Sequence, residues 1–379
     1  MKLNPGGRFG LSAMALTAAT AVLLTACSSS KTKAGSTTSA AGGDSSSSST
    51  AATGCASGTL KGEGSSAQKN AMDEWISKYQ AQCSGATVNY NATGSGAGVK
   101  QFTGNQVDFG GSDSALNAAK GEVAAGAKRC GSPAVDLPMV VGPIAVAFKV
   151  KGVDDATLTL TPKLVAQIFL GKITKWNDPA ITAGNSGVTL PAENITVFFR
   201  SDASGTTENF EKYLKAAAPA DFTAETGKSW PGKVGQGKPQ SQGVQQALTS
   251  TEGSISYIEY SFAVSGNLST AKIDNGGGAV ALSADTASKA LDAATVVGTG
   301  NDVTLKLDYA TKQAGAYPII LVTYEIVCTN YSDPAVAKRV KSFLTYSSEA
   351  GQKDLVSIGY GPLPDSIKAK VTAAIAAIS

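Results

Sequence analysis

The chain has 379 residues, a formal net charge of +3 and a hydrophobic content of 42%, but not a single histidine. Without histidine there is no Ser-His or Cys-His nucleophile and no common zinc ligand set, so the composition disfavours catalysis. Lysine and arginine are scattered along the chain rather than clustered, which argues against a nucleic-acid partner.

The first 26 residues have the pattern of an export signal. Lys2 and Arg8 form a positive start, and the apolar run at residues 11–26 falls short of the ~20 residues that a membrane-spanning helix needs. The run ends in Leu-Thr-Ala-Cys, which resembles the lipobox of bacterial lipoproteins. We therefore expect residues 1–26 to be removed as a signal peptide and Cys27 to carry a lipid such as palmitate. The alternative is an ordinary cleaved signal beside an unmodified Cys27.

Residues 27–54 have the composition of a flexible tether. Between Ser28 and Thr53 the chain consists of Ser, Thr, Ala and Gly with three charges and no large apolar residue. Such a segment cannot bury enough surface to offset the entropy lost on ordering. We therefore expect an exported protein whose folded body is tied by a lipidated tether to the outer face of the cell membrane.

The remaining residues suffice for two domains of usual size and alternate between strand and helix patterns. Strands are expected at residues 59–62, 86–90, 142–150, 195–199, 254–258 and 317–327. Apolar residues at helical spacing predict helices around residues 72–79, 164–169 and 340–344. This alternation is typical of an α/β fold.

Three strand-to-helix junctions carry similar loops rich in Ser, Gly and Thr, at residues 62–68, 93–98 and 201–207. Each junction leaves free N–H groups at the positive end of a helix dipole, where glycine permits close approach of a ligand. Ordinary helix capping explains any one of these loops, but three of them predict an anion site. The glycines of the second loop do not have G-x-G-x-x-G spacing, so a nucleotide enzyme is poorly supported.

Five segments, taken in order, carry a family resemblance. They are GEGSS at 62–66, GSGAGVKQF at 94–102, VDFGGSD at 107–113, LGKITKWNDP at 170–179 and RSDASGT at 200–206. From about Gly58 to the C-terminus the chain resembles the phosphate-binding protein of the phosphate-specific ABC transport system.

The resemblance implies an α/β fold of the two-lobed type II periplasmic-binding-protein kind, with hinge strands and the ligand between the lobes. The first lobe would be discontinuous and comprise residues 55–147 and 316–379, and the second would comprise residues 148–315. The protein would be a monomeric receptor without cofactor and without enzymatic activity. It would bind inorganic phosphate and deliver it to the membrane permease subunits of an ABC importer.

The resemblance also implies a set of phosphate-binding residues. They are Ser65, Ser66, Ala67, Ser95, Asp113, Arg200, Asp202, Ser204, Gly205 and Thr206. Asp202 would pair with Arg200, whose planar fork suits a tetrahedral oxyanion. The family commonly has Thr-Phe where this chain has Ser66-Ala67, which keeps the donors but makes the wall of the site smaller.

Asp113 decides between the alternative ligands. A carboxylate that faces an anion repels it unless the anion carries a proton to donate, as phosphate does at neutral pH. A receptor for another oxyanion such as sulfate or molybdate, on the same fold, is the alternative hypothesis. A phosphatase-like enzyme is a third, and it lacks a histidine, clustered metal ligands and an evident base beside a nucleophile.

Apart from Cys27, the chain has four cysteines, Cys55, Cys83, Cys130 and Cys328, without C-x-x-C spacing. In an exported protein this pattern predicts two disulfides rather than a metal site, and four cysteines permit three connectivities. Cys55 precedes the first strand and Cys83 follows the helix that returns from it, so we expect these two to pair. Cys130 would then pair with Cys328.

Overall fold

The computed structural model describes residues 54–379, which belong to one compact unit, and the expected signal peptide and most of the expected tether lie outside this range. The strands are β1 (Gly58–Gly64), β2 (Ala86–Asn91), β3 (Phe109–Ser112), β4 (Ala134–Lys149), β5 (Thr159–Leu160), β6 (Thr196–Arg200), β7 (Gln236–Lys238), β8 (Ser254–Glu259), β9 (Ser269–Thr270), β10 (Lys272–Asp274), β11 (Ala279–Val280), β12 (Thr295–Val296), β13 (Leu305–Lys306) and β14 (Ile320–Cys328). The helices are α1 (Lys69–Gln82), α2 (Ser95–Thr103), α3 (Glu122–Cys130), α4 (Pro162–Phe169), α5 (Pro179–Thr182), α6 (Gly205–Ala217), α7 (Gln240–Ser250), α8 (Tyr260–Ser265), α9 (Ala284–Leu291), α10 (Pro334–Ser348) and α11 (Asp365–Ala376), with short 3-10 turns at Ala350–Gln352 and Val356–Ile358.

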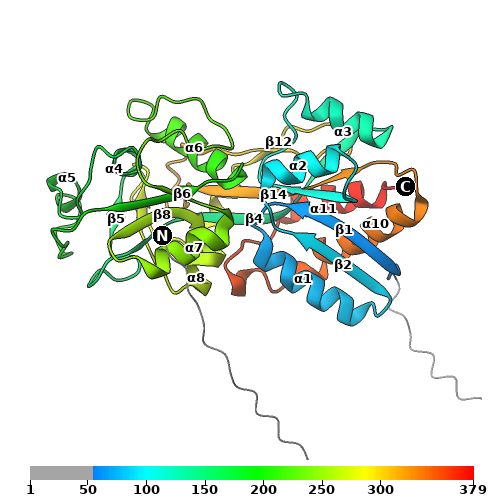
Figure 1. Ribbon diagram of the computed structural model, residues 1–379, viewed down its shortest axis with the longest axis horizontal. Coiled ribbons are helices and arrows are strands. Elements are labelled where there is room, and N and C mark those ends of the chain that lie inside the picture. The colour runs from blue at the N-terminus through cyan, green and yellow to red at the C-terminus, as the bar shows by residue number, and fades with distance from the viewer. Residues whose placement is uncertain (1–53) are drawn as a thin grey trace, which may run out of the picture. The chain divides into compact units, whose positions relative to one another are not determined.

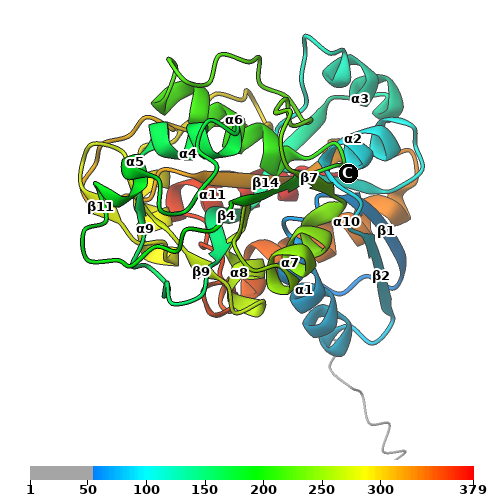
Figure 2. The same cartoon turned by 60° about the vertical axis from the view of Figure 1, so that its left-hand side comes forward.

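Most of the strands form one mixed nine-stranded sheet in the order β2-β1-β3-β14-β4-β8-β6-β7, with β9 paired to β4. The two long strands β4 and β14 run through the middle of the molecule (Figures 1 and 2). In both views α2 and α6 lie on one side of these strands and α7 and α8 on the other. The expected α/β fold is confirmed.

The long strand β4 connects two hydrophobic cores. Its first part pairs antiparallel with β14, and its last six residues, from Ile144 to Lys149, pair antiparallel with β8. Val141 packs into a core around Trp75 and Phe343, whereas Ile144 packs into a second core around Trp176. Two cores joined by shared strands make the fold two-lobed, with β4 and β14 as the crossings.

The observed β4 begins at Ala134, eight residues before the expected strand. Asp136 and Pro138 interrupt the apolar pattern there, and proline is normally excluded from central strands because it lacks an N–H donor. The structure accommodates Pro138 opposite Tyr324, where β4 carries one extra residue: Val140 pairs with Thr323, so Met139 has no partner in β14. A bulge of this kind cannot be predicted from the local pattern, because it depends on the partner strand.

Several helices begin with the same combination of residues. Thr161, Asp178 and Asp333 each accept a hydrogen bond from a backbone N–H of the first turn, and each precedes a proline at the first helical position. The side-chain oxygen satisfies a free donor and proline has the backbone angle of a helix already. These caps fix where α4, α5 and α10 begin.

Both expected disulfide pairings are confirmed. Cys55 is joined to Cys83, with 5.5 Å between their Cα atoms, and Cys130 to Cys328, with 5.4 Å. The first bond ties the start of β1 to the end of α1, and the second ties the end of α3 to the end of β14.

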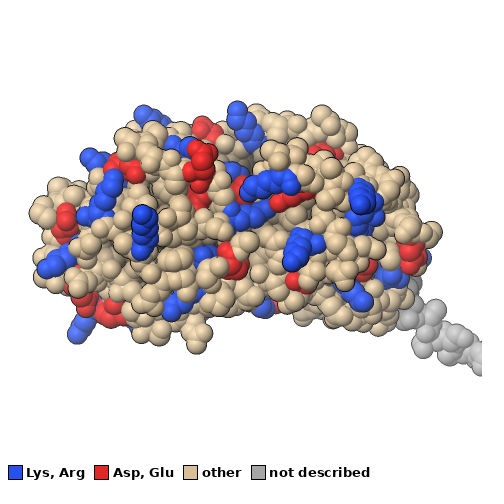
Figure 3. All heavy atoms as spheres, turned by 45° about the horizontal axis from the view of Figure 1, so that its top comes forward, with Lys and Arg blue, Asp and Glu red and all other residues tan. Residues whose placement is uncertain are grey.

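The surface of the described residues carries charges of both signs. On the face shown in Figure 3, basic and acidic side chains alternate without a large area of one sign. Among the helices of residues 54–379, none combines the length and the apolar character that a membrane crossing needs.

Glycine allows α2 to lie directly on the sheet. A Cβ atom placed on Gly98 would lie 2.6 Å from the Cα atom of Gly64 and would also collide with the carbonyl oxygen of Gly111. Both neighbours are backbone atoms of paired strands, so they cannot move aside easily. This contact brings the N-terminus of α2 to the carboxyl ends of β1 and β3.

We predict that Gly98→Ala lowers the free energy of unfolding by about 1–3 kcal/mol, because the added methyl group forces backbone apart. The gain of roughly 1 kcal/mol that alanine brings to a helix interior does not offset this clash. Urea denaturation measures the difference. Gly187→Ala is the control, because nothing lies within 4 Å of a Cβ atom there. Equal stability of Gly98→Ala and wild type would contradict the close packing of α2.

Candidate functional site

The expected site residues come together at the carboxyl ends of strands from both halves of the sheet. Ser65, Ser66 and Ala67 follow β1, and Asp113 follows β3. Ser95 begins α2, Arg200 ends β6, and Ser204, Gly205 and Thr206 lie at the start of α6. All of these residues are buried, and Asp202 is partly exposed. The structure thus gathers polar residues from distant parts of the chain into one buried cluster.

Asp113 is the acceptor at the centre of this cluster. Its carboxylate accepts hydrogen bonds from the hydroxyl groups of Ser65, Ser95 and Thr323, the last two at 2.8 Å. Burial raises the pKa of Asp113 to about 6, although these hydroxyl donors favour the ionised form. The negative charge of Glu259 also raises this pKa.

Ser95 and Asn209 connect Asp113 to the N-terminus of α6. The Ser95 hydroxyl oxygen accepts from the backbone N–H groups of Asp113 and Gly205, both at 3.1 Å. The side-chain amide of Asn209 donates to the carbonyl oxygen of Asp113 at 2.7 Å. Ser204 caps α6 by accepting from the N–H of Thr207 at 3.2 Å, so capping and a site position coincide in this loop.

Arg200 is held in place by Asp202. Its Nε atom donates to Asp202 Oδ1 at 2.8 Å and its Nη2 atom donates to Oδ2, a two-point contact. The Nη1 atom faces the cluster and donates to Thr206 Oγ1 at 3.3 Å and to Ser241 Oγ at 3.1 Å. Burial disfavours the charge of Arg200, but the Asp202 carboxylate raises its pKa above the usual value.

Both oxygen atoms of the Asp202 carboxylate accept hydrogen bonds from Arg200. Burial opposes its ionisation, but Arg200 and the backbone N–H of Gln240 keep the pKa of Asp202 below its usual value. The Gln240 contact, at 2.8 Å, also places the first turn of α7 beside the site. Asp202 therefore acts as a positioning residue for Arg200 and α7.

Some hydrogen-bonding groups of the loop after β1 already have partners within the protein. The N–H of Ala67 donates to the Ser65 hydroxyl oxygen at 3.0 Å. The hydroxyl of Ser66 lies 3.0 Å from that of Ser241 and accepts from the Ser241 N–H at 3.1 Å. The loop after β1 thus meets the N-terminus of α7 directly.

Sequence reasoning missed three members of the cluster: Thr323, Ser241 and Glu259. Thr323 lies in the middle of a buried strand, Ser241 lies in the first turn of α7, and Glu259 directly follows the strand expected at residues 254–258. Glu259 is 1% exposed, its Oε1 atom accepts from Thr206, and its Oε2 atom has no partner among the described residues. The one sequence feature that could have indicated Glu259 is a glutamate directly after the expected strand at residues 254–258.

The cluster combines one arginine, several hydroxyl and N–H donors, and two buried carboxylates. The donors suit an oxyanion, and the carboxylates suit an oxyanion that itself carries protons. Within residues 54–379 no group of three His, Cys, Asp or Glu side chains is arranged to hold a metal ion.

We predict that the stability difference between wild type and Asp113→Asn, measured without ligand, depends on pH. The pKa of Asp113 is about 6 in the folded protein against 3.8 for the free side chain. Protonated Asp113 therefore makes its full contribution to the free energy of unfolding below pH 3.8, and this contribution is lost as the pH rises to about 6. Wild type should lose up to about 3 kcal/mol relative to the variant across this window.

Chemical denaturation at several pH values measures this difference. Other buried acids, such as Asp136, are present in both proteins and cancel. A difference that stays constant between pH 4 and pH 7, within roughly 0.5 kcal/mol, would contradict the burial of an ionisable Asp113.

Comparison with known proteins places the chain in a family. Residues 49–350 match the family model described as PBP superfamily domain. The chain is 47% identical to "Phosphate-binding protein PstS 3" of Mycobacterium leprae, over 87% of this chain and 91% of the relative. It is 45% identical to "Phosphate-binding protein PstS 2" of Mycobacterium tuberculosis, over 84% of this chain and 87% of the relative.

Solved structures share the fold. A phosphate-binding protein from Stenotrophomonas maltophilia superposes with a TM-score of 0.65 at 20% identity, covering 84% of this chain and 94% of that protein. A high affinity periplasmic phosphate-binding protein, PfluDING, gives 0.67 at 23% identity, covering 83% of this chain and 93% of that protein. With its sequence relatives, its two-lobed fold and its buried oxyanion cluster, the chain belongs to the PstS phosphate-binding proteins of the PBP superfamily.

Proposed function

We propose that this protein is an extracytoplasmic, lipid-anchored receptor that binds inorganic phosphate and delivers it to an ABC importer. It is a binding protein, not an enzyme. The observation that carries the proposal is the pairing of anion donors with the buried carboxylate of Asp113. The relatives, which are named phosphate-binding proteins, support the same ligand.

The proposed ligand set combines a cation, hydroxyl groups, backbone N–H groups and one carboxylate. It consists of Ser65, Ser66, Ala67, Ser95, Asp113, Arg200, Ser204, Gly205 and Thr206, with Asp202 holding Arg200. Arg200 supplies a full positive charge, and the first turn of α6 presents backbone N–H groups at the positive end of its dipole. A dianion gains from both, because the site is buried and water does not screen these charges.

The carboxylate of Asp113 supports phosphate over sulfate. Phosphate at neutral pH keeps at least one proton, which it can donate to Asp113. Sulfate keeps none, so its oxygen lone pairs would face the carboxylate without a compensating hydrogen bond. A buried site that leaves such groups unpaired can reject an analogue by about 10⁴–10⁵-fold.

The proposed lobes, residues 55–147 with 316–379 and residues 148–315, meet at this site. Hydrogen bonds from Gly205 N–H to Ser95 and from Asn209 to Asp113 run between them. A contact between Ser66 and Ser241 does the same on the opposite side of Arg200. Phosphate bound among these groups would hold the lobes together, and the importer's permease subunits would receive the closed, monomeric receptor.

The proposed anchor explains how the receptor stays near the importer. The support is the Leu-Thr-Ala-Cys sequence that ends at Cys27, followed by a tether up to residue 54. Both lie outside the described residues except for Gly54. A lipid on Cys27 would hold the folded body at the outer face of the cell membrane.

Isothermal calorimetry with phosphate, arsenate and sulfate tests the ligand. We predict that wild type binds phosphate and arsenate and discriminates against sulfate by about 10⁴-fold. In Asp113→Asn the phosphate-to-sulfate ratio should fall, mostly through gained sulfate binding, because the amide can donate to sulfate. Asp108→Asn is the control, because the Asp108 carboxylate lies outside the cluster and accepts a hydrogen bond from the backbone N–H of Lys61.

Two outcomes would count against the proposal. An unchanged ratio in Asp113→Asn would show that this residue does not set selectivity. Preferred binding of sulfate or molybdate by wild type would contradict the phosphate receptor itself.

The anchor is tested by Cys27→Ala in the producing bacterium. We predict that the variant is released into the medium or accumulates as the unprocessed precursor, because no thiol remains to carry the lipid. Detergent phase partitioning of membrane fractions measures the change. Wild-type partitioning of the variant would exclude lipidation at Cys27.

A further inference from the structure

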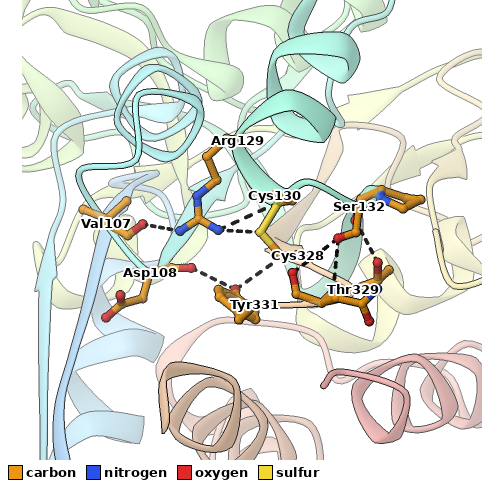
Figure 4. The surroundings of a disulfide bond; sticks show 10 residues. Val107, Asp108, Arg129, Cys130, Ser132, Cys328, Thr329 and Tyr331 are labelled. Atoms are coloured by element: carbon orange, nitrogen blue, oxygen red, sulfur yellow. Dashed lines mark hydrogen bonds between the residues drawn. A yellow bond between two sulfur atoms is a disulfide. The ribbon is translucent and has the colours of Figure 1, made fainter. Parts of the chain in front are cut away.

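The disulfide between Cys130 and Cys328 lies beside Arg129 (Figure 4). Arg129 Nη1 donates a hydrogen bond to Cys328 Sγ and lies 3.8 Å from Cys130 Sγ. Among the ion pairs of residues 54–379, Arg129 takes part in none. The guanidinium charge therefore acts on the sulfur atoms.

Packing fixes the guanidinium group in this position. Arg129 Nη2 donates to the carbonyl oxygen of Val107 at 2.9 Å. Its central carbon lies 4.5 Å from the ring centre of Phe102 and 5.3 Å from that of Tyr331. The buried Nε atom has no hydrogen-bond partner among the described residues. The Nη1 atom is thus the part of the guanidinium that faces the sulfur atoms.

The two sulfur atoms differ in access. Both cysteines line a surface pocket of about 360 Å³, but Cys328 is fully buried, whereas Cys130 is partly exposed. An incoming thiolate therefore reaches Cys130 more readily than Cys328. Attack on Cys130 makes Cys328 the leaving group, and a cation beside a cysteine sulfur stabilises its thiolate.

We infer that the Cys130–Cys328 disulfide is a site of thiol–disulfide exchange for a dithiol reductant, with Arg129 stabilising the departing Cys328 thiolate. One thiolate of the reductant attacks Cys130 Sγ, the bond between the two sulfurs breaks, and its electron pair stays on Cys328. The second thiol of the reductant, as thiolate, then attacks the mixed disulfide and releases Cys130. The protein disulfide is reduced to two thiols and the reductant is oxidised to a disulfide.

The second disulfide also lines a pocket, together with Lys338 and Lys341, but among the described residues no cationic side chain donates a hydrogen bond to its sulfur atoms. Cys55 Sγ lies 3.9 Å from the carbonyl oxygen of Gln82. A carbonyl oxygen presents partial negative charge, which opposes a thiolate. Cys55–Cys83 therefore serves as the reference bond within the same molecule.

Dithiothreitol is the probe, applied to the folded full chain at fixed pH, and alkylation with mass spectrometry follows each disulfide separately. We expect Cys130–Cys328 to be reduced faster than Cys55–Cys83. Arg129→Gln should slow reduction of Cys130–Cys328 by about fivefold, because a leaving thiol of higher pKa departs more slowly. Arg129→Lys should keep most of the rate, and Lys128→Gln, an exposed neighbour without a sulfur contact, should keep nearly all of it.

A monothiol, 2-mercaptoethanol, tests the direction of attack in wild type. Acid quenching should trap the mixed disulfide on Cys130. An adduct on Cys328 would overturn the inference, and so would an Arg129→Gln variant that is folded and reduced as fast as wild type. If Arg129→Gln loosens the fold, both disulfides become reducible together, and the position of the wild-type adduct still decides.

Discussion

The buried carboxylate of Asp113 connects three separate parts of this fold. It follows β3, and it accepts hydrogen bonds from Ser65 after β1, from Ser95 at the start of α2 and from Thr323 in β14. A buried charge without such donors would be too costly to keep. The ends of β1 and β3, the start of α2 and the middle of β14 must therefore meet around this carboxylate, and we propose that this meeting point is the phosphate site.

Arg200 and Glu259 place a second pair of opposite charges across from Asp113. Asp202 accepts hydrogen bonds from the Nε and Nη2 atoms of Arg200, and the remaining Nη1 atom faces the cluster. Glu259 lies on the other side of Thr206 with one oxygen free of partners among the described residues. The site thus offers both donors and acceptors, which distinguishes a protonated oxyanion from a fully ionised one.

Much of this arrangement follows from local sequence, and some of it does not. The three Ser/Gly/Thr loops, Arg200 at a strand end and the cysteine pairs are predictable because each depends on neighbouring residues or on the order of elements. Thr323 and Ser241 reach the site only through the pairing of β14 and the placement of α7, which are long-range events. The first part of β4 was missed for the same reason, since its Pro138 lies beside a bulge at Met139 that forms only when β4 pairs with β14. The lobe boundaries and the ligand contacts stay predictions.

The central claim is that phosphate is recognised by the proton that it donates, not by its charge alone. Monofluorophosphate tests this claim most directly, because it is a dianion of similar size with fluorine in place of the proton-bearing hydroxyl. Calorimetry at pH 8 should show that wild type binds monofluorophosphate far more weakly than phosphate, by at least about 100-fold, since Asp113 then faces only lone pairs. Equal affinity for the two anions would contradict the account.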